Sequence, residues 1–297
     1  FQSLDVHPSA ANSIVFGTSN GVLFSADNGG SYTPRNIGLS VTVGDPASIG
    51  PIIVDPANAS RWIAFSVSGE VFGTINGGSN WNVIGAGLRG TRIETVTVHP
   101  TRPQRVYAGL RNLRTEATSA ALYRSDDFAQ TWLRFNNNLS LDTINAIVFD
   151  PVTVGAAATT RMFALGADFA PIGQPTFSYR GGVFRSSDGG VNWTPADNLI
   201  PQPEIGPAAL GEVNAMLVDP VSAEGGISQI LYFAANGRVF CLGNTPQLEA
   251  PRIWRSSNGS TSWTPRDSLP LGGCQPRLMY PQPVALTFQS GSVTTLY

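Results

Sequence analysis

Five phrases of one pattern carry the residues of this chain whose types and spacing could do acid–base chemistry. Each has a serine or threonine, an acidic or amide residue two positions later, and an aromatic residue five positions after that. Carboxylates placed in this way could act as general acids or bases. Two of the five phrases carry asparagine, which cannot act as a base, so we predict a structural role in tight turns, with the ring packed between sheets. The residues are Ser25, Asp27 and Tyr32; Thr74, Asn76 and Trp81; Ser125, Asp127 and Trp132; Ser186, Asp188 and Trp193; and Ser256, Asn258 and Trp263.

Carboxylates outside these phrases are the candidates for glycoside hydrolysis. That reaction needs two carboxyl groups about 5 Å apart for retention of configuration, or about 6.5–9.5 Å apart for inversion. The sequence therefore assigns no catalytic residue; it favours a protein that is not an enzyme and leaves a glycoside hydrolase open. The candidates, among which sequence spacing singles out no pair, are Asp45, Asp142, Asp168, Glu204, Glu212 and Glu249.

Arginines gather in one stretch of a chain that contains no lysine. Six of the 18 arginines lie between residues 89 and 114. Guanidinium groups pair with carboxylates, so a patch of them would suit an acidic protein surface or ligand. A solvated rim, with Glu94 and Glu116 as counter-charges, is the other interpretation. The four candidates that we expect on one face are Arg89, Arg92, Arg111 and Arg114.

A unit of roughly 50 residues repeats along the chain and organises these motifs. Each unit has an apolar run that ends in Asp-Pro or His-Pro, a second apolar run, and two runs that flank one of the five phrases. Four short strands per unit are typical of a β-propeller blade. We therefore predict an all-β propeller, a single domain over residues 1–297, with four-stranded blades at residues 1–40, 41–90, 91–140, 141–200 and 201–270. Part of a sixth blade, at residues 271–297, favours a fragment of a six- or seven-bladed or larger protein.

The last three complete units carry insertions. From the dipeptide to the serine or threonine, the separation grows from 18 and 19 residues in the first two units to 26, 36 and 37 in the others. Most of the added length falls between the second and third strands, at roughly residues 111–120, 167–182 and 243–253. These connections emerge on the face opposite the five phrases, and long loops on a rigid scaffold are where binding usually occurs. An exposed insertion without function is the alternative; the candidate binding residues are Phe169, Phe177 and Tyr179.

The composition narrows the possible functions. Charged residues make up 13% of the chain and the formal net charge is −2, which excludes a general nucleic-acid-binding surface. No apolar run reaches the length of a membrane span, and two histidines with two cysteines predict no metal site and no cofactor. Cys241 and Cys274 are the candidate pair for one disulfide. We expect a secreted, extracellular or cell-surface protein, with a periplasmic location as an alternative.

The repeated phrase resembles the Asp-box, or bacterial neuraminidase, repeat. With the Asp-Pro turn, the whole unit looks like those of xyloglucan-active glycoside hydrolases, sortilin-type receptors and the photosystem II assembly propeller, and the resemblance covers nearly the whole chain. It implies a β-propeller but no single activity. The xyloglucan-active enzymes carry a catalytic aspartate in a Thr-Asp-x-Gly-Gly phrase on their first blade. Here that position holds Ser19 or Asn20, which argues against inherited catalysis.

We therefore expect a non-catalytic extracellular propeller that docks a partner protein, or a larger assembly, through its long-loop face. The alternative is a carbohydrate-active propeller: a glycoside hydrolase, a sialidase-like enzyme, or a protein that binds sugar without turnover. Two carboxylates that converge in a cleft would favour this alternative.

Overall fold

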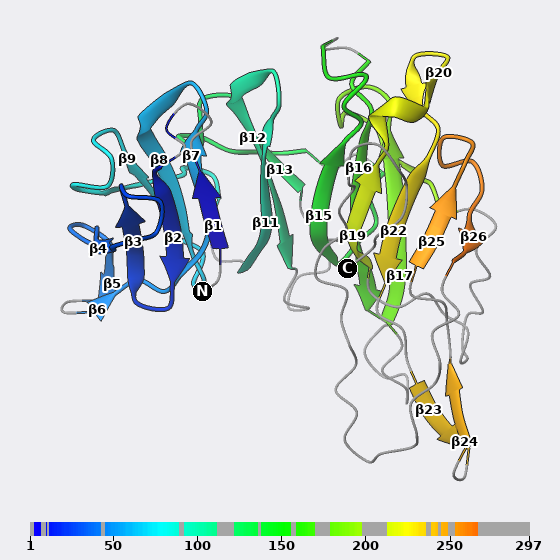
Figure 1. Ribbon diagram of the computed structural model, residues 1–297, viewed down its shortest axis with the longest axis horizontal. Coiled ribbons are helices and arrows are strands. Elements are labelled where there is room, and N and C mark those ends of the chain that lie inside the picture. Colours follow the sequence, from blue (N-terminus) through cyan, green and yellow to red (C-terminus); the bar gives the residue numbers. More distant parts are fainter. Residues whose placement is uncertain are drawn as a thin grey trace. The chain divides into compact units, whose positions relative to one another are not determined.

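The computed structural model describes residues 3–6, 10, 12–42, 45–88, 92–111, 122–135, 138–155, 159–169, 179–197, 213–235, 239–242, 245–248 and 253–266, without the side chains of 40–46, 168–169, 179–180 and 239–248. The described residues form β-strands, turns and one short 3-10 helix, η1 (Pro220–Ser222) (Figure 1). They divide into two compact units, Phe1–Phe135 and Asn136–Tyr297. No helix among these residues is long and apolar enough to cross a membrane.

The first unit contains three antiparallel four-stranded sheets, each built from strands that follow one another in the chain. We name the strands of every sheet A to D in chain order. A two-stranded ribbon, β5 (Ser40–Thr42) and β6 (Asp45–Pro46), lies between the first two sheets in the sequence. The sheets are β1 (Ser3–Val6), β2 (Ile14–Thr18), β3 (Gly21–Ser25) and β4 (Thr33–Pro34); β7 (Ile49–Asp55), β8 (Asn58–Ser66), β9 (Val71–Thr74) and β10 (Asn82–Ile84); and β11 (Arg92–His99), β12 (Arg102–Arg111), β13 (Leu122–Ser125) and β14 (Leu133–Arg134).

The second unit contains two sheets of the same kind, together with two short ribbons. The ribbons are β20 (Ala223–Glu224) with β21 (Ile227–Ser228), and β23 (Val239–Leu242) with β24 (Thr245–Leu248). The sheets are β15 (Thr143–Phe149), β16 (Met162–Phe169), β17 (Tyr179–Ser186) and β18 (Thr194–Pro195); and β19 (Val213–Val218), β22 (Leu231–Ala235), β25 (Ile253–Ser256) and β26 (Thr264–Pro265).

The predicted fold class is confirmed: the described chain is all-β and fits a partial β-propeller. Every four-stranded sheet lies inside the residue limits that the repeat predicts for a blade. The expected sixth blade lies outside the described residues, as do its strands. The single domain over residues 1–297 stays a prediction.

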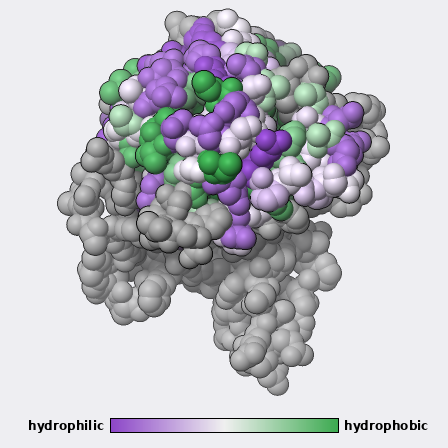
Figure 2. Space-filling model, turned by 90° about the vertical axis from the view of Figure 1, so that its left-hand side faces the viewer, coloured by the Kyte–Doolittle hydropathy of each residue, from purple (hydrophilic) through white to green (hydrophobic). Residues whose placement is uncertain are grey.

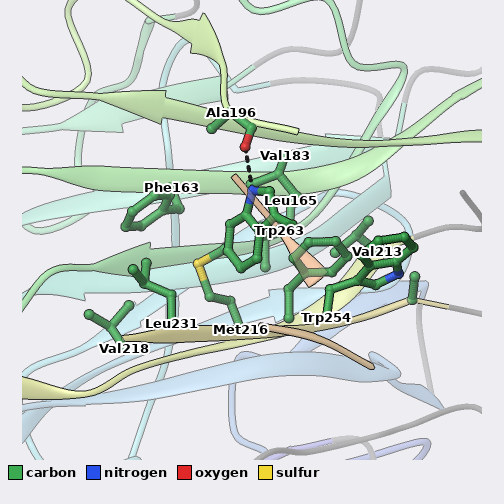
Figure 3. Packing of buried hydrophobic residues seen from close by; sticks show 12 residues of the cluster. Phe163, Leu165, Val183, Ala196, Val213, Met216, Val218, Leu231, Trp254 and Trp263 are labelled. Atoms are coloured by element: carbon green, nitrogen blue, oxygen red, sulfur yellow. Dashed lines mark hydrogen bonds between the residues drawn. The ribbon is translucent and has the colours of Figure 1, made fainter. Parts of the chain in front are cut away.

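Buried B strands explain how these sheets hold together. All five residues of β22 are buried, as are the last five residues of β8, because these strands lie inside their sheets and are covered on both faces. In the second unit, β22 contributes to a cluster with Phe163, Trp254 and Trp263 (Figure 3). The Trp263 indole Nε1 donates a hydrogen bond of 2.6 Å to the Ala196 carbonyl, which joins neighbouring sheets. Trp81 makes the equivalent bond, of 2.8 Å, to the Arg35 carbonyl in the first unit.

The two ends of the sheets differ in how the chain is connected. Every C–D connection has seven residues: 26–32, 75–81, 126–132, 187–193 and 257–263. The B–C connections at the opposite end grow from residues 19–20 and 67–70 in the first two sheets to 112–121, 170–178 and 236–252 in the last three. One end of the fold is therefore constant and the other end is variable.

Two of the predicted B–C loops contain strand. In the fourth sheet β16 and β17 stay paired as far as Phe169 and Tyr179, which are register partners. In the fifth, the insertion includes the β23–β24 hairpin, which carries Cys241. Interpreting the whole of 167–182 and 243–253 as loop was wrong, because inserted residues that keep pairing across a hairpin extend the sheet rather than leave it. Cys274 and the predicted disulfide lie outside the described residues.

Candidate functional site

The five C–D connections are the first candidate site, and all five form the same turn, here called the box turn. In the first, the Ser25 hydroxyl donates to Asp27 Oδ1 at 2.8 Å and accepts the Gly29 N–H at 2.9 Å. Asp27 Oδ1 in turn accepts the Ser31 N–H at 2.8 Å, and the Ser31 hydroxyl donates to Oδ2 at 2.6 Å. The equivalent bonds recur in the other four turns.

These hydrogen bonds stabilise the charged form of the carboxylates. Hydrogen bonds from Ser31 and Ser25 lower the pKa of Asp27 from 3.8 to about 2. Burial alone would raise the pKa of Asp127, but hydrogen bonds from Thr131 and Ser125 outweigh it, and the pKa is lowered. A carboxylate that accepts several donors and stays ionised is a poor general acid, which supports a structural role for these residues.

Aspartate and asparagine fill the acidic position with matched partners four residues later. Asp188 Oδ2 accepts a 2.8 Å hydrogen bond from the Asn192 amide. In the second turn the amide is on the other side: Asn76 Nδ2 donates to Asn80 Oδ1. One turn geometry therefore tolerates either residue, provided that its neighbour supplies the complementary donor or acceptor.

The residue before each proline closes the A–B turn at the same end of the sheets. Asp55, Asp150 and Asp219 each accept the N–H of the residue two positions later, at 2.9, 3.2 and 2.9 Å. His99 takes the same place, and its Nδ1 accepts the Thr101 N–H at 3.3 Å. The interpretation of His99 as a turn residue fits this contact; His7 lies outside the described residues.

Protonation of His99 should destabilise the fold in mild acid. Burial, followed by the positive charges of Arg102 and Arg105, lowers the pKa of His99 from 6.5 to about 4. Since the unfolded chain takes up this proton near pH 6.5 and the folded chain only near pH 4, stability is complete above pH 6.5 and falls as the pH drops through this window. The loss should be about 2 kcal/mol by pH 5. Chemical denaturation at pH 7.5 and pH 5 measures it.

His99→Asn is the matched variant for that experiment, because its amide oxygen can accept the Thr101 N–H without titrating. The variant should lose at least about 1 kcal/mol less than the parent between pH 7.5 and pH 5. Equal losses in both proteins would show that other groups cause the acid sensitivity.

Two A–B turns also hold an arginine that the sequence interpretation missed. Arg61 Nε donates to Asp55 Oδ2 at 2.5 Å, and its guanidinium lies 4.3 Å from the Phe128 ring of the next sheet. Arg161 pairs with Asp150 at 3.0 Å, with 3% and 0% of the two side chains exposed. In the sheet where histidine replaces aspartate, Arg105 pairs instead with Asp126 at 2.6 Å. An arginine soon after Asp-Pro is the sequence signal that could have revealed these pairs.

The structure brings two of the four patch arginines together. Arg92 and Arg111 are register partners at the B–C end of β11 and β12. Both guanidinium groups pair with Glu94, at 3.1 and 2.7 Å, and the Arg92 side chain is 59% exposed. Arg89 and Arg114 lie outside the described residues. The described part of the patch is therefore a partly neutralised cluster of two arginines and one glutamate.

This cluster lies beside a groove along the three A strands of the first unit. The groove has a volume of about 880 Å³, and Arg92 and Glu94 are among its lining residues. Its other lining residues are mostly the apolar and backbone groups of β1, β7 and β11: Ser3, Leu4, Gly50, Pro51, Ile52, Ile53, Val67, Ile93, Thr95 and Val96. On the face drawn in Figure 2, hydrophobic residues form small separate groups among hydrophilic ones.

The remaining sequence candidates are only partly placed. Phe169 and Tyr179 face each other in register near the end of the β16–β17 ribbon, while Phe177 lies outside the described residues. Of the six carboxylates considered for hydrolysis, only Asp142 has a described side chain. Ser19 and Asn20 form the two-residue β2–β3 turn, where the Asn20 N–H bonds to Thr18 Oγ1 at 3.1 Å. No group of three possible metal-ligating side chains occurs among the described residues.

No protein-family model and no curated protein matches the sequence. Three solved structures are similar. A GH74 enzyme from Niastella koreensis has a TM-score of 0.59 and 19% identity, over 89% of this chain and 37% of its own. Sqt1 from Saccharomyces cerevisiae has a TM-score of 0.54 and 11% identity, over 90% and 62%. YCF48 bound to D1 peptide has a TM-score of 0.52 and 14% identity, over 89% and 66%.

These similarities show the fold and nothing finer. The chain spans less than two thirds of the length of each of the three proteins. At such low identity, enzymes and proteins of other kinds share one propeller architecture, so the activity must be argued from the site.

Proposed function

We propose that this chain is a non-catalytic propeller that binds a protein partner through the B–C end of its sheets, and that its five box turns make it a member of the Asp-box class. The observation that carries the proposal is the contrast between the two ends. The C–D turns keep one length and one hydrogen-bond pattern, whereas the B–C connections grow from two residues to 17. Variable loops on a constant scaffold are the usual arrangement of a binding surface.

The chemistry of the two ends supports the same choice. The described box-turn carboxylates are held by hydrogen bonds within their own turns. At the B–C end, Arg92 is largely exposed beside the groove and shares Glu94 with Arg111, so the cluster keeps an excess of positive charge. An exposed guanidinium beside a groove suits carboxylates on a partner. One fold neighbour, YCF48, is known with a bound D1 peptide, which supports peptide binding by this architecture.

Two further parts of the proposal rest on the sequence. Low charge and abundant Gly and Pro favour a secreted or cell-surface location. The expected partner is a protein or larger assembly; a carbohydrate-active propeller is the second candidate because a GH74 enzyme shares the fold.

Replacing Arg89, Arg92, Arg111 and Arg114 together by alanine should weaken partner binding about tenfold or more, since removing charged contacts at an interface commonly costs at least 1.4 kcal/mol. The partner is first identified by size-exclusion chromatography of the protein from its native source and mass spectrometry of what co-elutes. Affinity is then measured by calorimetry at two salt concentrations, and binding of the parent should weaken more at high salt than binding of the variant.

Arg102→Ala is the control, because Arg102 begins β12 at the opposite end of the same sheet. It should bind as tightly as the parent protein. Unchanged binding by the fourfold variant would exclude the patch. A monomer without partner that hydrolyses β-glucans or sialosides would overturn the proposal in favour of the second candidate.

A further inference from the structure

A cavity of about 340 Å³ lies between the first two sheets of the first unit, at the box-turn end. It is far from the B–C end in each sheet, so it is independent of the proposed docking surface. Its volume is within the range of small-molecule sites. Its lining combines two aromatic rings, one guanidinium and several hydroxyl and amide groups, contributed by Ser13, Val15, Phe24, Arg35, Val54, Ala59, Ser60, Trp62, Asn76, Gly77 and Ser79.

The equivalent space between the second and third sheets shows why this cavity exists. There the fourth residue of the box turn is Phe128, which is 2% exposed and packs against Arg61 of the preceding sheet. In the box turn of the second sheet this position is Gly77; the Gly77 N–H bonds to Ser60 as the Phe128 N–H bonds to Gln104. The register of β1–β2 and β7–β8 likewise places Ser13 where the next sheet has Arg61. Two small residues therefore replace a ring and its cation.

The backbone at Gly77 is already that of a residue with a side chain. Gly77 has φ 64° and Phe128 has φ 54°. A Cβ atom at Gly77 would meet only Trp62 Cζ2, at 3.7 Å, which is ordinary van der Waals contact. The space beyond it is thus shaped for an aromatic ring that the chain itself does not supply.

Arg35 provides a cation in this cavity without a carboxylate partner. It takes part in none of the ion pairs that join described residues. Its Nη1 donates to the Ser79 hydroxyl at 3.3 Å, and its Nε is buried without a hydrogen-bond partner in the described part of the chain. A buried donor without an acceptor is costly, so an anion that enters the cavity would gain a charge-assisted hydrogen bond.

We propose that this cavity binds a small aromatic carboxylate, with its ring beside Trp62 in the position that Phe128 takes between the next two sheets and its carboxylate on the Arg35 guanidinium. The ring gains apolar and aromatic contact with Trp62 and Phe24. The carboxylate supplies the acceptor that Arg35 Nε lacks.

Benzoate is the probe, measured by saturation-transfer NMR and by calorimetry with the whole chain. A ligand of this size should bind with a Kd of about 1 mM. Benzamide has the same shape but no charge, and should bind about tenfold more weakly. Arg35→Met should weaken benzoate binding by about the same factor, and Gly77→Phe should abolish it by filling the cavity as Phe128 does.

Asn28→Phe is the matched control for Gly77→Phe. Asn28 occupies the same position of the first box turn, with φ 63°, and is exposed. This variant should bind benzoate like the parent protein. The proposal is overturned if benzoate gives no saturable signal at concentrations well above the expected Kd, or if Gly77→Phe and Arg35→Met, both folded by their melting temperature, bind it unchanged.

Discussion

Replacing Arg161 by methionine should lower the free energy of unfolding by about 3–5 kcal/mol, because it leaves a buried carboxylate without its counter-charge. Asp150 is fully buried and pairs with Arg161 at 3.0 Å. The guanidinium also donates to the Ser228 carbonyl at 3.0 Å and to the Gly259 carbonyl, both in the next sheet. Its loss removes bonds between neighbouring sheets as well as the ion pair. Urea denaturation at pH 7.5 measures the change.

The double variant Asp150→Asn with Arg161→Met separates the charge from the packing. It removes both charges, so it should recover much of the stability lost by the single variant. Arg61→Met is the matched comparison, because Arg61 pairs with Asp55 in the same turn of another sheet but keeps 27% of its side chain exposed. Its cost should be smaller. A single Arg161 variant within about 1 kcal/mol of the parent would contradict this account.

Replacing Trp263 by alanine should cost about 3–5 kcal/mol, the usual cost of removing a large buried ring. Trp263 is 5% exposed, and its ring packs edge-on against Phe233 with centroids 4.7 Å apart. The substitution also removes the donor to the Ala196 carbonyl. Thermal and urea unfolding, followed by near-ultraviolet circular dichroism, measure the loss.

Trp263→Phe isolates the hydrogen bond, since a ring remains while the N–H is lost. It should cost about 1–3 kcal/mol from the carbonyl left without its donor, besides the loss of ring volume. Trp132→Phe is the control, because Trp132 Nε1 is buried but has no hydrogen-bond partner among the described residues. An equal cost for both variants would show that ring volume, and not the hydrogen bond between sheets, decides stability.

Much of the fold could be predicted because its signals are local. A strand and its neighbour in these sheets are joined by short connections, so the alternation of each run, the Asp-Pro turn and the Ser25-type phrase each act within about a dozen residues. The limits of the five sheets followed from the repeat. The change from loop to ribbon at Phe169 and Tyr179 did not, because continued strand pairing depends on both sides of an insertion at once.

The candidate site was less predictable because its groups come from different units of the repeat. The clustering of arginines was visible, but only the register of β11 and β12 shows Arg92 and Arg111 sharing Glu94. Arg161 gave no signal of its own: nothing local says that a guanidinium will reach across to Ser228 and Gly259. The aromatic cavity depends on what Gly77 and Ser13 lack relative to Phe128 and Arg61, which becomes clear only when the sheets are superposed.

The sequence by itself determined the all-β repeat, the strands of each sheet and the turn residues, because strand alternation and turn hydrogen bonds act between residues close in the chain. The tertiary structure alone decided which charges are paired, which are buried and where space is left between sheets. Those properties depend on side chains that are brought together from separate units, since neither an ion pair such as Asp150 with Arg161 nor the cavity beside Arg35 exists until the sheets pack.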